Sequence, residues 1–149
     1  MGTAANPLPA PLQAVVDSFR SAPASLRPQL LLEFARRVPP LPERLREDRS
    51  QLEQVHECMT PFFVASEVAE DASVRLFFDA PEEAPTTRGF AGILHEGLGG
   101  QPLDQVIGVP DDFYEALGLA EVISPLRLRG MAAILARLKR QLRAASVPG

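Results

Sequence analysis

Helical patterns occupy both ends of this sequence, and strand-like patterns occupy its centre. Three short central segments have strand-like patterns, in which apolar and polar residues alternate or apolar and β-branched residues predominate. They are Gln51 to Val55, Phe62 to Val68 and Ser73 to Phe78. Glu70, Asp71 and Ala72, between the last two, suit a hairpin turn. Because helical and strand patterns are segregated along the chain, they predict an α+β fold. We expect a small antiparallel sheet of about three strands packed against several helices.

Two helices are predicted before the strands. Apolar residues at helical spacing indicate the first helix over about Pro11 to Ser21. Ser25 is placed to cap the second, which continues until Pro39 and Pro40 stop it. The polar, proline-marked segment Val38 to Ser50 is predicted to be an ordered loop around the domain.

More helical segments are predicted after the strands. They cover Pro85 to Glu96, the short turn Pro102 to Ile107, and Pro110 to Leu117, which Gly118 closes. The last helix is the clearest, because it has one apolar stripe and a basic opposite face. The stripe consists of Met131, Ile134, Leu135, Leu138 and Leu142.

The length of 149 residues, with 46% apolar and 23% charged residues, is typical of one globular domain. Residues 1–149 are therefore predicted to form a single domain, with the Ala- and Pro-rich residues 1–11 flexible. The single cysteine excludes an internal disulfide. The chain has no signal-peptide pattern and no apolar run of about 18 residues. We therefore expect a cytoplasmic protein with no membrane partner.

Charge and motifs exclude several classes of function. Six basic residues and no acid follow Glu121, but the whole chain has a net charge of −4, no Trp and one Tyr, so nucleic-acid binding is not expected. No zinc-site spacing connects His56, Cys58 and His95, so no metal site is predicted, and His95 is expected on a helix surface. The chain also has no G-x-S-x-G elbow and no phosphate-binding glycine fingerprint.

Cys58 is the strongest candidate for chemistry. By composition alone, a single cysteine is usually a small buried apolar residue. Its neighbours His56, Glu57 and Thr60 are polar, and Pro61 bends the chain just beyond. A polar connection between strands favours an exposed, reactive thiol. His56 could share a proton with this thiol, or it could be an ordinary exposed loop histidine.

Four segments, in order, resemble the SufE family of sulfur-acceptor proteins over roughly Ala14 to Ala145. They are "LLLEFARRVPPLPERLRED", the cysteine-containing segment "VHECMTPFFV", "FFDAPEEAPTTRGFAGIL", and "EVISPLRLRGMAAILARLKRQL". The last of them resembles the family's S/T-P-x-R-x-x-G segment. The resemblance implies the fold shared with IscU-type scaffold proteins. It also places Cys58 on the sulfur-accepting cysteine, Glu83 on an acidic position before a helix, and Arg127 and Gly130 in the S-P-x-R segment.

The resemblance implies roles for Arg127 and Glu83. Arg127 would stabilise the thiolate or dock an acidic partner surface; otherwise it would form a surface ion pair, for instance with Glu83. Glu83 could equally be an ordinary acidic residue that stabilises the N-terminus of the following helix through the helix dipole.

The sequence departs from the family pattern beside the cysteine. Glu57 replaces a glycine, Thr60 a serine and Phe63 a tryptophan. The charge of Glu57 disfavours the thiolate, so it is expected to raise the pKa of Cys58 unless His56 or an arginine compensates.

The function implied by the resemblance is sulfur transfer. Cys58 would take persulfide sulfur from a SufS-like cysteine desulfurase, stimulate that enzyme, and pass the sulfur to an iron–sulfur scaffold complex. The pyridoxal phosphate would reside on the desulfurase, and this chain would be a carrier with no cofactor, not a stand-alone enzyme. Two alternatives stay open: an allosteric desulfurase-binding module with a dispensable cysteine, and a single-cysteine redox sensor. A monomer and a homodimer both fit the sequence.

Overall fold

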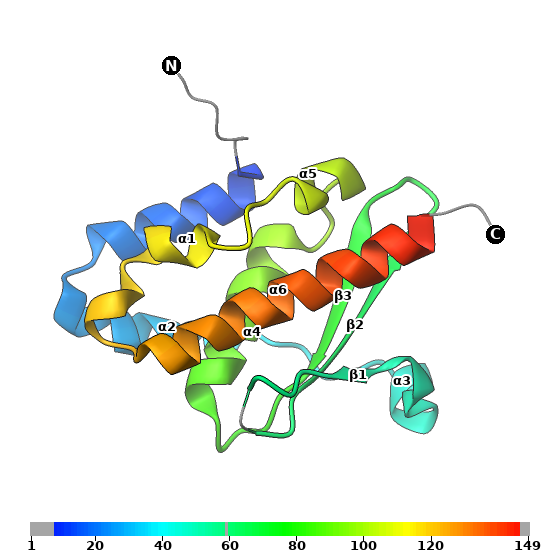
Figure 1. Ribbon diagram of the computed structural model, residues 1–149, viewed down its shortest axis with the longest axis horizontal. Coiled ribbons are helices and arrows are strands. Elements are labelled where there is room, and N and C mark those ends of the chain that lie inside the picture. The colour runs from blue at the N-terminus through cyan, green and yellow to red at the C-terminus, as the bar shows by residue number, and fades with distance from the viewer. Residues whose placement is uncertain (1–7, 59, 147–149) are drawn as a thin grey trace.

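The computed structural model describes residues 8–58 and 60–146, and all statements below concern these residues. The helices are α1 (Ala10–Ser21), α2 (Arg27–Ala35), α3 (Glu43–Glu47), α4 (Pro85–Leu98), α5 (Leu103–Ile107) and α6 (Pro125–Ser146). The strands are β1 (Glu53–Gln54), β2 (Phe63–Val68) and β3 (Val74–Asp79). Helices at both ends and strands in the centre confirm the predicted α+β class (Figure 1).

The three strands form one antiparallel sheet in the order β1-β2-β3. Strands β2 and β3 form a hairpin in which Phe63 pairs with Asp79 and Val68 with Val74. In the turn, the Asp71 carboxylate accepts hydrogen bonds from the backbone N–H and the hydroxyl of Ser73. Ala72 has a positive φ of 67° there. The predicted turn residues therefore make the predicted hairpin.

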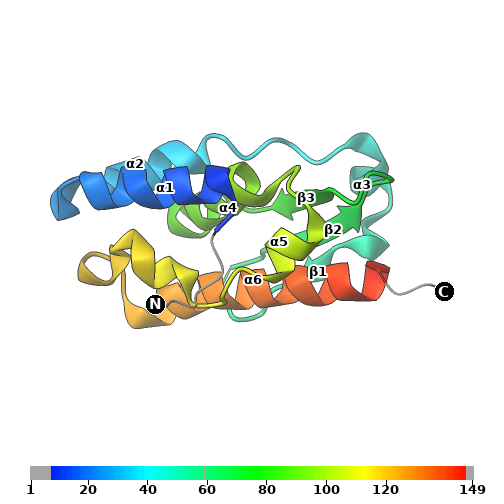
Figure 2. The ribbon, with the colours of Figure 1, turned by 90° about the horizontal axis from the view of Figure 1, so that it is seen from above.

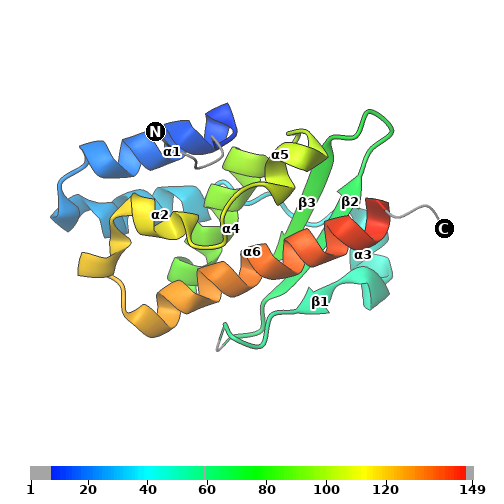
Figure 3. The ribbon, with the colours of Figure 1, turned by 45° about the horizontal axis from the view of Figure 1, so that its top comes forward.

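The elements are stacked in three layers (Figure 2). Helices α1 and α2 form one layer, α4 and the sheet lie in the middle, and α6 lies on the other side. The apolar stripe of α6 that the sequence predicted is fully buried. Helix α6 packs on β2. Figure 3 shows α6 running obliquely over the strands with its N-terminal end beside α4. This arrangement brings the N-terminal ends of α4 and α6 together.

Helix α4 is held close to the first layer because it has glycines where it touches other helices. A Cβ on Gly92 would lie 2.0 Å from the Phe34 carbonyl oxygen, and one on Gly89 would lie 2.6 Å from the Leu31 side chain. The Arg88 guanidinium, in the first turns of α4, donates hydrogen bonds to the carbonyl oxygens of Ala35 and Ala80 at 3.0 and 2.7 Å. The start of α4 is therefore tied to both flanking segments.

Several predicted boundaries differ from the structure. The loop predicted over Val38 to Ser50 contains the short helix α3, and Ser25 makes no cap for α2, whose N-cap is Leu26. The helix predicted from Pro110 is a 3₁₀ helix over Phe113–Leu117, closed as expected by Gly118 in the left-handed conformation.

The flexible segment predicted over residues 1–11 extends too far. Ala10 and Pro11 belong to α1, and Leu8 packs against the core; residues 1–7 lie outside the described residues. Proline fits the first turn of a helix, where its missing N–H costs nothing, so Pro11 is compatible with the start of α1.

Within the part of the chain that the structure describes, no helix is both long enough and apolar enough to cross a membrane.

Candidate functional site

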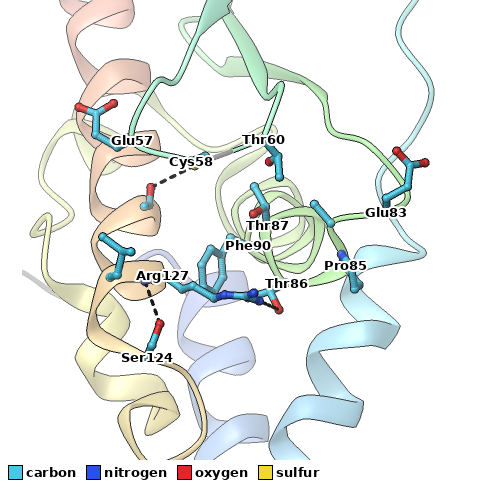
Figure 4. A pocket seen from close by; sticks show the side chains of 13 residues that line it. Glu57, Cys58, Thr60, Glu83, Pro85, Thr86, Thr87, Phe90, Ser124 and Arg127 are labelled. Atoms are coloured by element: carbon cyan, nitrogen blue, oxygen red, sulfur yellow. Dashed lines mark hydrogen bonds between the residues drawn. The ribbon is translucent and has the colours of Figure 1, made fainter.

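A cavity of about 660 Å³ opens where three segments meet: the loop after β1, the start of α4 and the start of α6 (Figure 4). Its lining includes Cys58, Thr60, Glu83, Thr86, Arg127 and Gly130. The structure therefore brings three of the four predicted site residues to one cavity. The fourth, His56, is exposed and is not part of the lining.

Cys58 forms part of the cavity wall, but it is only 7% exposed. We name residues 55–58 the cysteine loop. Within it, the Cys58 N–H donates a hydrogen bond to the Val55 carbonyl at 3.1 Å, which makes a tight turn. His56 and Glu57 point outward and are exposed, while the Cys58 side chain turns inward. The sequence left open whether Cys58 is buried or exposed in the free protein, although its polar neighbours favoured exposure. The structure shows a buried thiol, because these neighbours occupy the outer side of the turn.

Gly130 of α6 makes room for the Cys58 sulfur. The thiol points at the Gly130 carbonyl oxygen, with Sγ and O 3.9 Å apart. A Cβ on Gly130 would lie 3.3 Å from Sγ, which is tighter than ordinary van der Waals contact. The glycine of the S-P-x-R-x-x-G segment thus lets the cysteine loop lie directly on α6.

The environment of Cys58 favours the neutral thiol. Burial raises the pKa of Cys58 to about 11, the Glu57 carboxylate adds to this rise, and the Arg137 guanidinium opposes it. The predicted effect of Glu57 is confirmed. The arginine that opposes the rise in the pKa of Cys58, without cancelling it, is Arg137, which sequence reasoning did not single out. At neutral pH the buried sulfur is therefore a poor nucleophile in this conformation.

Arg127 lies on the first turn of α6 and crosses the cavity towards α4 (Figure 4). Its guanidinium donates a hydrogen bond to the Thr86 hydroxyl at 3.3 Å. Glu83 lies on the turn before α4 and is exposed. Across residues 8–58 and 60–146, no ion pair joins Arg127 to Glu83, so this alternative reading of the two residues is wrong. Arg127 is thus an exposed cation beside the cavity.

Sequence reasoning missed several residues of the site. Thr86 and Thr87 line the cavity from the first turn of α4. Thr60, which the sequence offered only as a polar neighbour of the cysteine, lines it too, and its hydroxyl oxygen is buried with no hydrogen-bond partner. Leu126 is 52% exposed at the cavity and gives it an apolar edge. Thr86 and Thr87 could have been found from the segment "EEAPTTRG", since a helix N-terminus, with its free backbone N–H groups, is a common place for a binding site.

The site does not resemble a metal centre. Among the described residues, no three His, Cys, Asp or Glu side chains gather in a way that could hold a metal ion. His95, expected on a helix surface, is half-buried in α4, with its Nδ1 buried and without a hydrogen-bond partner. Among the described residues, the cavity offers one thiol, one guanidinium, the carboxylates of Glu57 and Glu83, and several hydroxyls. A thiol in such a wall is suited to sulfur exchange with an acceptor or donor that reaches Cys58.

Comparisons with known proteins agree with this reading. The sequence matches the SufE family model, described as an Fe-S metabolism associated domain, over residues 13–142. An uncharacterized SufE-like protein of Mycobacterium tuberculosis is 53% identical over 143 residues, which cover 96% of this chain and 99% of that protein. The cysteine desulfuration protein SufE of Plasmodium vivax is 24% identical over 131 residues, which cover 86% of this chain and 51% of that protein.

Among solved structures, a hypothetical protein from Thermus thermophilus, determined in solution, superposes with a TM-score of 0.82 at 47% identity. The superposition covers 93% of this chain and 98% of that one. The family model covers most of the chain and the Mycobacterium relative is 53% identical, so the protein belongs to the SufE family, whose role lies in Fe–S metabolism.

Proposed function

We propose that the protein carries sulfur on Cys58, taking it from the persulfide of a SufS-like cysteine desulfurase and passing it to an iron–sulfur scaffold. The observation that carries the proposal is the position of the single cysteine of the chain in the wall of a cavity that also contains Arg127. Membership of the SufE family and the Plasmodium relative named as a cysteine desulfuration protein support the same role.

The proposed step is a thiol–persulfide exchange. The Cys58 thiol first loses its proton, and the thiolate attacks the terminal sulfur of the donor persulfide, R–S–SH. A new S–S bond forms at Sγ while the S–S bond of the donor breaks. The donor cysteine leaves as a thiolate and takes up the proton that Cys58 released. Cys58 ends as a persulfide, and no external oxidant or reductant is needed.

The burial of Cys58 sets a condition on this step. A thiol that is 7% exposed, with a pKa near 11, does not meet a second protein's persulfide in the conformation described. In our proposal the cysteine loop leaves α6 when the desulfurase binds, which exposes the sulfur and restores an ordinary pKa. The exposed Arg127 and Leu126 lie beside that opening and are suited to contact the partner.

We further propose that the chain works in the cytoplasm, without a cofactor of its own and as a carrier, not as a stand-alone enzyme. The pyridoxal phosphate that releases sulfur from L-cysteine belongs to the desulfurase. The role of this chain is to accept the sulfur, shield it in the cavity, and release it.

The test is the rate at which the purified desulfurase releases sulfide from L-cysteine under a thiol reductant. Wild-type protein is expected to stimulate this rate, and Cys58→Ser protein is expected to lose the stimulation while still binding the desulfurase. Undiminished stimulation by Cys58→Ser would contradict the carrier role and would establish the allosteric module with a dispensable cysteine.

The site disfavours the third reading, a peroxide sensor. Sensor cysteines are typically exposed and have a low pKa. Cys58 is buried, and its pKa is raised.

A further inference from the structure

An ion-pair network fastens the cysteine loop to α6. The Arg137 guanidinium, on α6, donates one hydrogen bond to Glu57 of the cysteine loop at 2.8 Å. It donates a second to Glu53 of β1 at 2.7 Å. These contacts use different nitrogen atoms, Nη2 for Glu57 and Nη1 for Glu53. One planar group thus joins the loop, the strand before it and the helix beneath it.

The network is anchored at its strand end. The Glu53 carboxylate also accepts hydrogen bonds from Gln141, at 3.0 Å, and from Arg140. Burial opposes the ionisation of Glu53, but these hydrogen bonds and charges outweigh it and lower its pKa. The pKa of Glu57 is also lowered, chiefly by the hydrogen bond from Arg137. Both carboxylates therefore stay ionised at neutral pH.

The network lies in line with the thiol. Gly130 and Arg137 are seven residues apart, about two helical turns, so they occupy the same face of α6. Cys58 contacts this face at Gly130, and the adjacent Glu57 contacts it at Arg137. Cys58 cannot leave α6 with its loop unless the contact between Glu57 and Arg137 gives way.

We propose that Arg137 is a positioning residue that acts through Glu57 and holds the cysteine loop closed, so that it sets how readily Cys58 becomes available. This proposal rests on the proposed function, because an available thiol matters only if Cys58 reacts. It assigns a purpose to Glu57, which stands where the resemblance places a glycine.

The two effects of Arg137 on Cys58 have opposite signs, which makes the proposal testable. As a charge, Arg137 favours the thiolate, and its loss would slow a thiolate reaction. As a clamp, which is our term for the contact of Arg137 with Glu57 that holds the cysteine loop closed, it keeps the thiol buried, and its loss would speed the reaction. The charged groups around the thiol are Glu57 and Arg137, which act on it directly, and Arg127 and Glu83, which line the cavity.

The experiment measures the second-order rate constant for alkylation of Cys58 by iodoacetamide, a neutral reagent, without a desulfurase. Arg137→Gln is expected to react about fivefold faster than wild type at pH 7.5 and low salt. The midpoint of its pH–rate profile is expected to move down, towards that of an exposed cysteine. Raising the salt to about 1 M should speed wild type about threefold, because salt screens the network, and should leave Arg137→Gln unchanged.

Two further variants complete the test. Glu57→Gln changes a side chain that is 52% exposed, so it covers the case in which Arg137→Gln fails to fold. This variant should also react faster than wild type and lose the salt dependence. Because loss of the Glu57 charge by itself favours the thiolate, hydrogen exchange of the Cys58 amide, which donates to the Val55 carbonyl in the closed loop, is measured as well. That exchange should be faster than in wild type, and unchanged exchange would overturn the proposal. Glu67→Gln is the matched control: it breaks the Arg44–Glu67 pair, 2.6 Å long and outside the cavity lining, and should alkylate like wild type.

Equal or slower alkylation of Arg137→Gln, or a salt dependence that survives in Glu57→Gln, would overturn the clamp. A similar acceleration in Glu67→Gln would also overturn it, because general loosening of the fold would then explain the result. Since the alkylation assay contains no desulfurase, its result does not depend on sulfur transfer. The clamp can therefore be disproved while the proposed function holds, and the proposed function can be disproved while the clamp holds.

Discussion

Cys58 shows how one residue links pH to stability. The fold raises the pKa of its thiol from 9.0 to about 11, so the folded protein keeps a proton that the unfolded chain has lost over that interval. Stability must therefore be fully present below pH 9 and must fall as the pH rises towards 11. Two pKa units correspond to about 2 to 3 kcal/mol of unfolding free energy.

The check is urea unfolding of wild type and Cys58→Ala from pH 7 to pH 11. The difference in free energy of unfolding between the two proteins should be constant below about pH 8.5 and then move against wild type by about 2 to 3 kcal/mol. The comparison cancels the titration of the remaining groups. A constant difference up to pH 11 would mean that the folded thiol ionises as freely as an exposed one.

The predictability of the site follows from how local each effect is. The effect of Glu57 on Cys58 could be predicted because the two residues are adjacent in sequence. The burial of Cys58 could not, because it depends on Gly130, 72 residues away, where the missing side chain receives the sulfur. Arg137 lies 80 residues from Glu57 in sequence, and the helix pattern alone does not distinguish it from the other cations on the basic face of the last helix.

At the scale of elements, α4 contributes part of the cavity wall, and its glycines let it pack closely against α2. The contact of Gly92 with the Phe34 backbone leaves no space for a Cβ, and a backbone atom cannot move aside as a side chain can. Gly92→Ala is expected to lower the free energy of unfolding by more than about 3 kcal/mol.

Gly130→Ala is the matched control in a second helix. Its new Cβ would meet only the Cys58 sulfur, at 3.3 Å, and the gain in helix propensity is about 1 kcal/mol. Its free energy of unfolding should stay within about 1 kcal/mol of wild type. Urea unfolding of both variants checks the pair, and equal losses would contradict the packing assigned to α4.

The elements themselves were predictable where one local pattern decides. The β2–β3 hairpin follows from the strand-like patterns and turn residues of its sequence, and the apolar stripe of α6 from helical spacing. Gly118 likewise marks the end of the 3₁₀ helix Phe113–Leu117. The short helix α3 and the two-residue strand β1 were not defined in this way, because elements of one turn or two residues carry too little periodicity.

At the scale of the whole molecule, the packing of the helices on the sheet buries the single cysteine of the chain. The cysteine loop lies on α6 with the start of α4 beside it, so that one thiol, one guanidinium, two carboxylates and several hydroxyls of the described residues share one cavity. This assembly could not be derived from periodicity, which gives elements but not their packing. The resemblance to the SufE family supplied the sulfur-transfer hypothesis that the cavity now supports.

The most direct test of that hypothesis is the intact mass of the protein after incubation with a cysteine desulfurase and L-cysteine, without reductant. Wild type is expected to gain about 32 Da, the mass of one sulfur atom, and a thiol reductant should remove it. Cys58→Ser protein should gain nothing. A wild-type mass that does not change while the desulfurase is active, or an equal gain in Cys58→Ser, would contradict the claim that Cys58 carries the sulfur.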